Sequence, residues 1–378
     1  MQLHIYTVDF RYLYALEDFT EVTVERKHLG VSTLRVVLWA GAEGAGFLQR
    51  GHWLRRETLS GQNFPGVWEM YRIQKITVSE NRMEITAVSP WFLARRRLIK
   101  PKNAGQEVVE LTGSADEAVK SWAASALPEF GMAAARPAPE GEAEPFSADS
   151  YSPLDNAVEK LLKQRMMGIR CRFDREEKSF TLDTASAADK TMDGAAAAGN
   201  SPVIFSIRYD NIVSLSYSED EQDVVTTVFA RDSSGTVQVY GDEAAGFDRR
   251  EEYISLSQGD SIQQRVEDTL AAESLSFEAE IYQGETFTYG ADYDIGDVVT
   301  AWVELPAMQE ENGAFTGTTV WKKINRQITA AREHYKGAER TVDLTFGDPP
   351  PTMMQRLTAQ SRKQNTDSAG LWKQIRAL

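Results

Sequence analysis

The sequence lacks the features that mark several large classes of protein. Its 378 residues include one cysteine, Cys171, which excludes an internal disulfide framework and a multi-cysteine zinc site. No apolar run approaches the roughly 20 residues that a membrane-spanning helix needs. The start of the chain also lacks the basic and then apolar order of a secretory signal, so we expect a soluble protein made in a cytoplasm. Four histidines occur without metal-ligand spacing: His4, His28, His52 and His334.

Motifs for catalysis are also missing. The glycine-rich segment Gly41–Gly46 lacks the Lys-Ser/Thr pair of a phosphate-binding loop. Cys171 alternates onto the apolar face of a predicted strand, which favours a buried structural thiol over a nucleophile. Asp292 and Asp294 flank a tyrosine in a predicted turn, where aspartates typically bond backbone amides. Acid–base catalysis by such carboxylates is the alternative. We predict a protein without enzymatic activity, cofactor or metal.

Charge is distributed unevenly along the chain. The formal net charge is -15, and residues 201–300 alone hold 21 acidic and 5 basic side chains. Residues 1–100 hold 10 acidic and 14 basic side chains and are therefore slightly positive. A strongly negative surface repels DNA, so it suits a protein along which DNA slides, although it also simply favours solubility.

The first two hundred residues predict strands followed by helices. Apolar and polar residues alternate through much of residues 1–100, which is typical of β-structure. Ser114 and Glu117 form a capping-box pattern, which predicts a helix that ends before Pro128. A second helix is predicted to start at Ser152-Pro153 and to end at Gly168.

The stretch from Tyr289 to Phe346 has the clearest local pattern in the second half. Its turn-forming residues give way to the β-branched Val298-Val299-Thr300, so a turn should lead directly into a strand. Alternation on both sides of Lys336-Gly337 predicts a β-hairpin. The pattern Trp321, Ile324 and Ile328 before this turn echoes the pattern Trp68, Ile73 and Ile76 before the turn at Ser79–Arg82. This echo predicts two similar β-units, one near each end of the chain.

Several segments together resemble one viral protein family. They are Phe205–Ser218, Arg249–Tyr253, Tyr293–Val299 and Leu344–Gly347. In their order along the chain, after a β-rich start and a helical insert, they are similar to the siphovirus Gp37-like tail proteins. Those proteins in turn resemble phage baseplate hub proteins and the N-terminal hub domain of tail-associated lysins. The resemblance covers roughly residues 1–348.

The resemblance implies an α+β, β-rich fold with a phage tail hub-like architecture, in which two tube-like β-barrel or sandwich domains flank a helix-containing α+β insert. We expect a first tube-like β-domain at 1–100, the helix-containing insert at 101–200, an acidic β-rich connecting domain at 201–275, a second tube-like β-domain at 276–348 and a C-terminal tail at 349–378. About thirty residues follow the second β-domain, which leaves no room for a lysin domain.

The resemblance also implies a function. Three chains of a hub form a ring of six similar β-units, which joins the sixfold tail tube to a threefold tip and surrounds a DNA channel. The implied partners are two further copies of this chain, a distal tail or tube protein above, and a tip, spike or fibre protein below. DNA passes without specific binding, and the host envelope is reached indirectly. The protein would reside in the virion tail, after assembly in the host cytoplasm.

Candidate residues for these roles follow from the pattern. The expected ring-interface residues are apolar members of the two similar hairpins: Trp68, Tyr71, Ile73, Ile76, Trp321, Ile324, Ile328 and Phe346. The expected channel-facing acidic residues are Glu278, Glu280, Asp292 and Asp294.

Two other functions remain open on the sequence. One is a cell-wall-degrading enzyme of the tail tip. The other is a receptor- or carbohydrate-binding module in which Trp39, Trp53 or Trp302 stacks on a sugar ring, although we predict that each of these tryptophans packs in a core.

Overall fold

The computed structural model describes most of the chain and groups it into two compact units. The described residues are 1–56, 69–103, 105–139, 141–220, 224–232, 235–241, 246–255, 266, 269–270, 274–281, 286–311, 314–337 and 339–347. The first unit takes residues 1–215 and 278–346, and the described residues of the second fall in Ser216–Phe277 together with Gly347. None of the described helices is long and apolar enough to cross a membrane.

The first hundred residues contribute the neighbouring strands at one end of a large sheet. Their strands are β1 (Leu3–Tyr6), β2 (Tyr12–Leu16), β3 (Glu21–Lys27), β4 (Thr33–Trp39), β5 (Trp53–Arg56), β6 (Met70–Ser79) and β7 (Arg82–Val88). They lie in the order β2-β1-β5-β6-β7-β4-β3, and every neighbouring pair is antiparallel. Alternate side chains of all of these strands meet in one apolar core, so the sheet curls around it.

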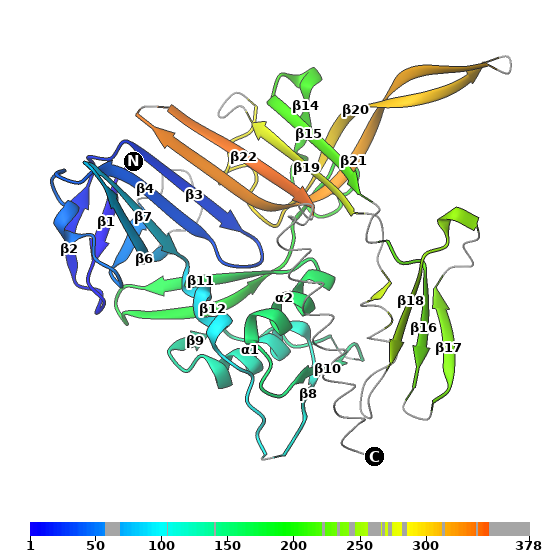
Figure 1. Ribbon diagram of the computed structural model, residues 1–378, viewed down its shortest axis with the longest axis horizontal. Helices are drawn as coiled ribbons and strands as arrows, with labels where there is room; N and C mark the ends of the chain where they lie inside the picture. Colours follow the sequence, from blue (N-terminus) through cyan, green and yellow to red (C-terminus); the bar gives the residue numbers. More distant parts are fainter. Residues whose placement is uncertain are drawn as a thin grey trace. The chain divides into compact units, whose positions relative to one another are not determined.

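The sheet continues through a strand that comes more than 280 residues later in the chain. This strand, β21 (Ala314–Lys336), pairs with β3 through Ala330–Tyr335. It also pairs with β22 (Glu339–Gly347) and with β20 (Val298–Glu311). The remaining strands on this side are β13 (Asp189–Lys190), β14 (Ile204–Ser206), β15 (Ile212–Asp220) and β19 (Ser274–Ile281). The two β-rich ends of the sequence therefore share one sheet (Figure 1).

A helix-containing insert packs beside this sheet. It holds β8 (Val108–Gly113), α1 (Ala115–Ala126), β9 (Phe130–Met132), β10 (Glu144–Asp149), α2 (Leu154–Gln164), β11 (Gly168–Asp174) and β12 (Ser179–Ala185). The predicted capping box is present, because the Glu117 amide donates to the Ser114 hydroxyl over 3.1 Å and the Ser114 amide donates to the Glu117 carboxylate over 2.8 Å. Both predicted helices are confirmed.

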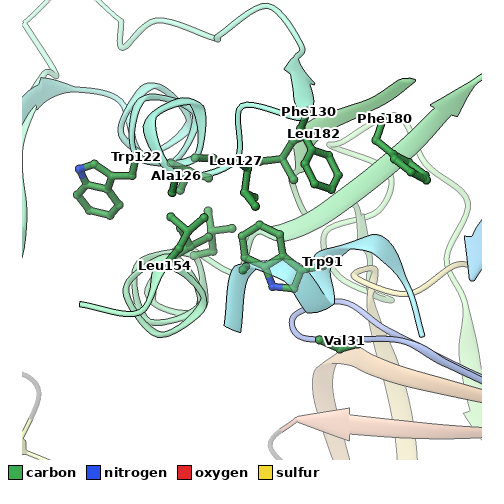
Figure 2. Packing of buried hydrophobic residues seen from close by; sticks show 14 of the residues in the cluster. Val31, Trp91, Trp122, Ala126, Leu127, Phe130, Leu154, Phe180 and Leu182 are labelled. Atoms are coloured by element: carbon green, nitrogen blue, oxygen red, sulfur yellow. The ribbon is translucent and has the colours of Figure 1, made fainter. Parts of the chain in front are cut away.

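A second apolar core joins the insert to the first β-region. Trp91 lies in a 3₁₀ segment directly after β7. It is close to Leu127, which follows the last residue of α1, and to Leu154, the first residue of α2 (Figure 2). The same cluster includes Trp53 of β5 and Phe180 of β12, whose rings lie 4.9 Å apart. Three tryptophans, Trp53, Trp91 and Trp122, are thus buried in the cluster where helices and sheet meet.

The second unit has a small sheet of its own. In it, β16 (Thr227–Arg231) pairs antiparallel with β17 (Val237–Gly241) and parallel with β18 (Glu251–Ser255). Val228, Ala230 and Val266 form its apolar core.

The predicted fold class is confirmed, since the structure is β-rich with a helical insert and sandwich-like sheets. In the part of the chain that the structure describes, the large sheet does not close into a barrel. The predicted turn into a strand at Val298 and the hairpin about Lys336-Gly337 are both present. The five-part domain division stays a prediction.

We predict that Trp91→Ala lowers the free energy of unfolding by about 3–5 kcal/mol, because it leaves a large cavity between the helices and the sheet. The matched control is Trp39→Ala, since the Trp39 side chain is 59% exposed, and this change should cost about 0.5 kcal/mol or less. Urea unfolding followed by tryptophan fluorescence and circular dichroism measures both. Equal losses in the two variants would contradict the assignment of Trp91 to the core.

Candidate functional site

The turn before β20 is built by aspartates and two buried tyrosines. The Thr288 amide donates to the Asp292 carboxylate over 2.7 Å, and the Asp294 amide donates to Asp297 over 2.9 Å. Tyr289 and Tyr293 are each 1% exposed and anchor the turn. The Ile295 amide donates to the Asp294 carboxylate over 2.8 Å, so the prediction that Asp292 and Asp294 bond backbone amides is confirmed.

A buried chain of alternating charges connects this turn to four strands. We call it the ion chain, and it consists of Asp294, Arg26, Glu69, Arg56, Glu333 and Arg340. Its successive oxygen–nitrogen distances, from Asp294 to Arg340, are 2.6, 2.8, 3.2, 2.5 and 2.8 Å. The ion chain contains three carboxylates and three guanidiniums, so its charges balance, which a buried group of ions requires.

The centre of the ion chain is the most deeply buried part. The Glu333 side chain is 1% exposed and that of Arg56 is 3% exposed. Burial favours the neutral acid, but the positive charges of Arg56 and Arg340 and the Tyr335 hydroxyl outweigh burial and hold the pKa of Glu333 at about 2. Burial also acts on Asp294, where the charge of Arg26 prevails and lowers the pKa.

A cavity of about 110 Å³ lies against one end of the ion chain. Arg26, Glu69 and Asp294 contribute polar groups to its wall, and Trp91 and Cys171 contribute apolar ones. Cys171 packs against the core around Trp91, and burial raises the pKa of its thiol to about 12. The predicted structural role of Cys171 is consistent with this position, because a neutral thiol is a poor nucleophile.

The structure places the expected ring-interface residues in different environments. Tyr71, Ile73, Ile324, Ile328 and Phe346 are buried within the chain itself. A side chain that is covered within one chain has little surface to offer a neighbouring copy.

The other expected ring-interface residues lie elsewhere. Ile76 and Trp321 are half-buried, and the Arg208 guanidinium lies 4.2 Å from the centre of the Trp321 ring. Trp68 lies outside the described residues.

The expected channel-facing acids also differ from one another. Asp292 is exposed and Glu280 is half-buried, whereas Asp294 is paired with Arg26 inside the ion chain. The side chain of Glu278 lies outside the described residues.

The tryptophans considered for sugar stacking differ in how far their side chains are exposed. Trp53 is 6% exposed and packs in the core, as predicted, and Trp302 is half-buried. The core prediction is wrong for Trp39, which is 59% exposed because it is the last residue of β4 and points away from the curled sheet.

Strands β20 and β21 continue beyond the sheet as a two-stranded ribbon (Figure 1). Beyond Trp302, β20 pairs only with β21 in the described residues, and β21 takes its other partners only from Ile328 onward. We call the part formed by Val303–Glu311 and Ala314–Lys322 the ribbon. Both of its outer edges therefore carry backbone groups without a strand partner among the described residues. Isolated two-stranded ribbons are marginally stable in water, which makes the ribbon a candidate for contact with another chain.

A family model matches residues 2–348, which is most of the chain, and its description is "Siphovirus ReqiPepy6 Gp37-like protein". The chain belongs to this Gp37-like family. The family predicted from the sequence is thereby confirmed. No curated protein matches the sequence.

Solved structures share the fold of this Gp37-like chain. The 43 kDa tail protein of prophage MuSo2 from Shewanella oneidensis has a TM-score of 0.55 at 10% identity, covering 92% of this chain and 98% of its own. A tail protein from Neisseria meningitidis MC58 has a TM-score of 0.54 at 11% identity, covering 92% and 96%. Prophage tail protein gp18 from Listeria monocytogenes EGD-e has a TM-score of 0.54 at 11% identity, covering 96% and 99%. The fold is therefore that of phage tail proteins.

We predict that Glu333→Gln lowers the free energy of unfolding by about 3–5 kcal/mol at pH 7, because it leaves the buried guanidinium of Arg56 and the half-buried one of Arg340 without their shared carboxylate. The pKa of Glu333 is lowered on folding from 4.5 to about 2, so its contribution is present above about pH 4.5 and is lost as the pH falls toward 2. The stability of the variant should therefore change less between pH 5 and pH 2.5 than that of the wild type.

The control is Glu84→Gln, which removes a surface pair with Arg35 and should cost less than about 1 kcal/mol. Urea unfolding at a series of pH values measures both variants. A Glu333→Gln variant as stable as the control at pH 7 would show that the ion chain does not hold the sheet together.

Proposed function

We propose that this Gp37-like protein is the structural hub of a phage or phage-like tail, in which three copies form a ring that joins the tail tube to the tip. The observation that carries the proposal is the recurrence of one hairpin type in one sheet. Both β6–β7 and β21–β22 are antiparallel hairpins with a bulge in their first strand, at Gln74 and at Thr329 respectively. Membership of the Gp37-like family and the fold of tail proteins support it.

Two similar hairpins in each chain give a threefold assembly six similar positions. Closed rings are built from repeated interfaces between identical chains, and three chains with two hairpins each approximate sixfold symmetry. Such a ring fits a sixfold tube on one side and a threefold tip on the other. The proposed partners are accordingly two further copies of this chain, a tube protein above and a tip, spike or fibre protein below.

We place the joint between copies on the part of β6 beyond its pairing with β5 and on the ribbon, which extends from β21 away from the β21–β22 hairpin. Val78 of β6 is 58% exposed and Val320 of the ribbon is 47% exposed, and each is close in sequence to a half-buried candidate, Ile76 or Trp321. Apolar side chains beside unpaired strand edges suit contact with another strand, which satisfies backbone groups and covers apolar surface together.

The ring would surround the path of the DNA. Residues 201–300 carry 21 acidic side chains against 5 basic ones, and the exposed Asp292 belongs to this region. A negative lining lets a polyanion pass without adhering. In this proposal the protein has no enzymatic activity, resides in the virion tail, and reaches the host envelope only through its neighbours.

We predict that the purified full chain behaves as a trimer, with a mass three times the 42.3 kDa of one chain, and that it leaves peptidoglycan intact. Size exclusion with light scattering measures the mass, and negative-stain images should show a ring with a central channel. A monomer that clears a peptidoglycan zymogram would instead support a cell-wall-degrading enzyme.

We predict that Val320→Asp reduces trimer formation at least tenfold while leaving the circular dichroism spectrum and the melting temperature of the monomer unchanged. The added carboxylate would have to be buried without a partner at the joint, which is costly. The matched control is Val239→Asp on β17, where the side chain is 57% exposed and lies outside the proposed joint. Equal effects of the two substitutions on the trimer would contradict the proposed position of the joint.

A further inference from the structure

The small sheet of the second unit has a core on one of its faces. Val228 and Ala230, on the central strand β16, lie in this core together with Val266. Successive side chains along a strand point to opposite faces of the sheet. Phe229, which lies between Val228 and Ala230, therefore belongs to the other face.

That other face carries a row of apolar side chains across all three strands. Phe229 is paired directly with Val239 of β17 and with Tyr253 of β18, and directly paired residues lie on the same face. Phe229 is half-buried, Val239 is 57% exposed and Tyr253 is 56% exposed. Val237, two residues before Val239 on β17, shares the face and is 48% exposed. We call these four residues the apolar face.

The composition of the apolar face is the reverse of what water favours. An antiparallel sheet with one solvated face normally presents polar side chains there. Here the charged side chains are set aside from the central row, since Arg231 is paired with Val237 and Glu251 with Thr227. Exposed apolar side chains that lie next to one another mark a surface that another segment or molecule covers.

The charge of the second unit restricts what can cover the apolar face. Residues 216–277 contain 14 acidic and 4 basic side chains. The exposed Asp248 and Glu251, directly before and at the start of β18, belong to this excess. A second copy of the same acidic unit would be repelled, whereas a basic segment would be attracted.

The chain itself contains such a basic segment. Residues 349–378, which lie outside the described residues, have a single acidic side chain, Asp367. They follow Gly347, the last described residue, which groups with the second unit. The segment has five basic side chains: Arg356, Arg362, Lys363, Lys373 and Arg376.

The sequence of residues 371–378 has the pattern of an amphipathic helix. Lys373 and Arg376 fall on one side of the helix. The apolar residues gather on the other side, at the spacing i, i+1, i+4 and i+7: Leu371, Trp372, Ile375 and Leu378. A helix of this length is too short to be stable alone in water, so we expect it to form only against an apolar surface.

The dimensions of the two apolar surfaces match. Neighbouring strands lie about 4.8 Å apart, so the row from Val239 through Phe229 to Tyr253 spans about 10 Å. A helix of eight residues is about 12 Å long. A flexible linker of the length between Gly347 and Leu371 spans roughly 25 Å on average, which is comparable with the diameter of a small domain.

We propose that residues 371–378 fold as a short helix on the apolar face of their own chain. Trp372 and Ile375 cover the row through Phe229, and the indole adds an aromatic contact with Tyr253. The linker holds the segment at a roughly millimolar effective concentration, which favours its own chain over a neighbouring copy. The proposal concerns a single chain and does not depend on the ring.

The test uses the purified full chain with the photoreactive residue p-benzoylphenylalanine in place of Tyr253. Irradiation should cross-link this position to the tryptic peptide of residues 364–373, which contains Leu371 and Trp372, and mass spectrometry identifies the peptide. The cross-linked product should run as one chain of 42.3 kDa on a denaturing gel, because both ends of the cross-link belong to the same chain.

Variants assign the cross-link to the apolar side of the expected helix. Trp372→Ala with Ile375→Ala should lower the yield at least tenfold. The matched control, Met353→Ala with Met354→Ala, removes two apolar side chains from the same segment and should change the yield less than twofold. A second control carries p-benzoylphenylalanine in place of Tyr151, which is 62% exposed in the first unit, and should give no cross-link to residues 364–373. The melting temperature of each protein checks the fold.

Three results would overturn the proposal. One is the absence of any cross-link between position 253 and residues 364–373. Another is a cross-linked product with the mass of two chains only, which would show that the segment of a neighbouring copy covers the face. The third is an equal yield for the Trp372/Ile375 double variant and the unchanged segment, which would show a chance encounter instead of a docked helix.

Discussion

The pairing of β21 with β3 is the interaction on which the first unit depends. It joins the strands from the first hundred residues to those that follow Ala188 in one sheet. β21 has 23 residues and changes partners along its length, with β20 at one end and β22 and β3 at the other. A strand that belongs to two hairpins fixes the geometry of both, because side-chain direction and register are continuous along its backbone.

The ion chain favours one register of this strand pairing. Opposite charges in a protein interior are costly unless each finds its partners, so the network stabilises one arrangement of strands and penalises others. Glu333 illustrates this, because it is shared by Arg56 from β5 and Arg340 from β22. A shift of β21 by one residue would separate Glu333 from both. The network therefore favours this register of β21 over a shifted one.

Local features of the fold were predictable from the sequence, and long-range ones were not. The capping box at Ser114 and the aspartate turn before Val298 depend on residues close together in the chain. Glu333 was missed because the bulge at Thr329 changes the alternation, so that Ile328 and then Ala331 and Glu333 face the interior. Strict alternation from Ile328 would have placed Glu333 outside.

The candidate interface residues show the same difference between local and long-range features. The apolar pattern pointed to Ile73 and Ile328 as ring-interface residues, and both are buried within the chain. A pattern of inward-facing residues does not distinguish the core of one chain from a joint between chains, so their role in a ring stays a prediction. The cavity of about 520 Å³ that Arg11 and Arg175 line had no signature in the sequence, since these two residues come from turns that are far apart along the chain. The packing of Phe10 against Phe173 and Phe180 brings the two turns together.

The long separation between β3 and β21 also has a consequence during synthesis. Thr23 and His334, which face each other across this pairing, are 311 positions apart. At a translation rate of roughly 5–20 residues per second, the outer edge of β3 waits on the order of 15–60 s for its partner. Throughout that interval a nascent chain presents an open strand edge, the kind of surface that promotes aggregation. The charged side chains of Glu25 and Lys27 on this strand are suited to discourage a wrong partner until β21 emerges.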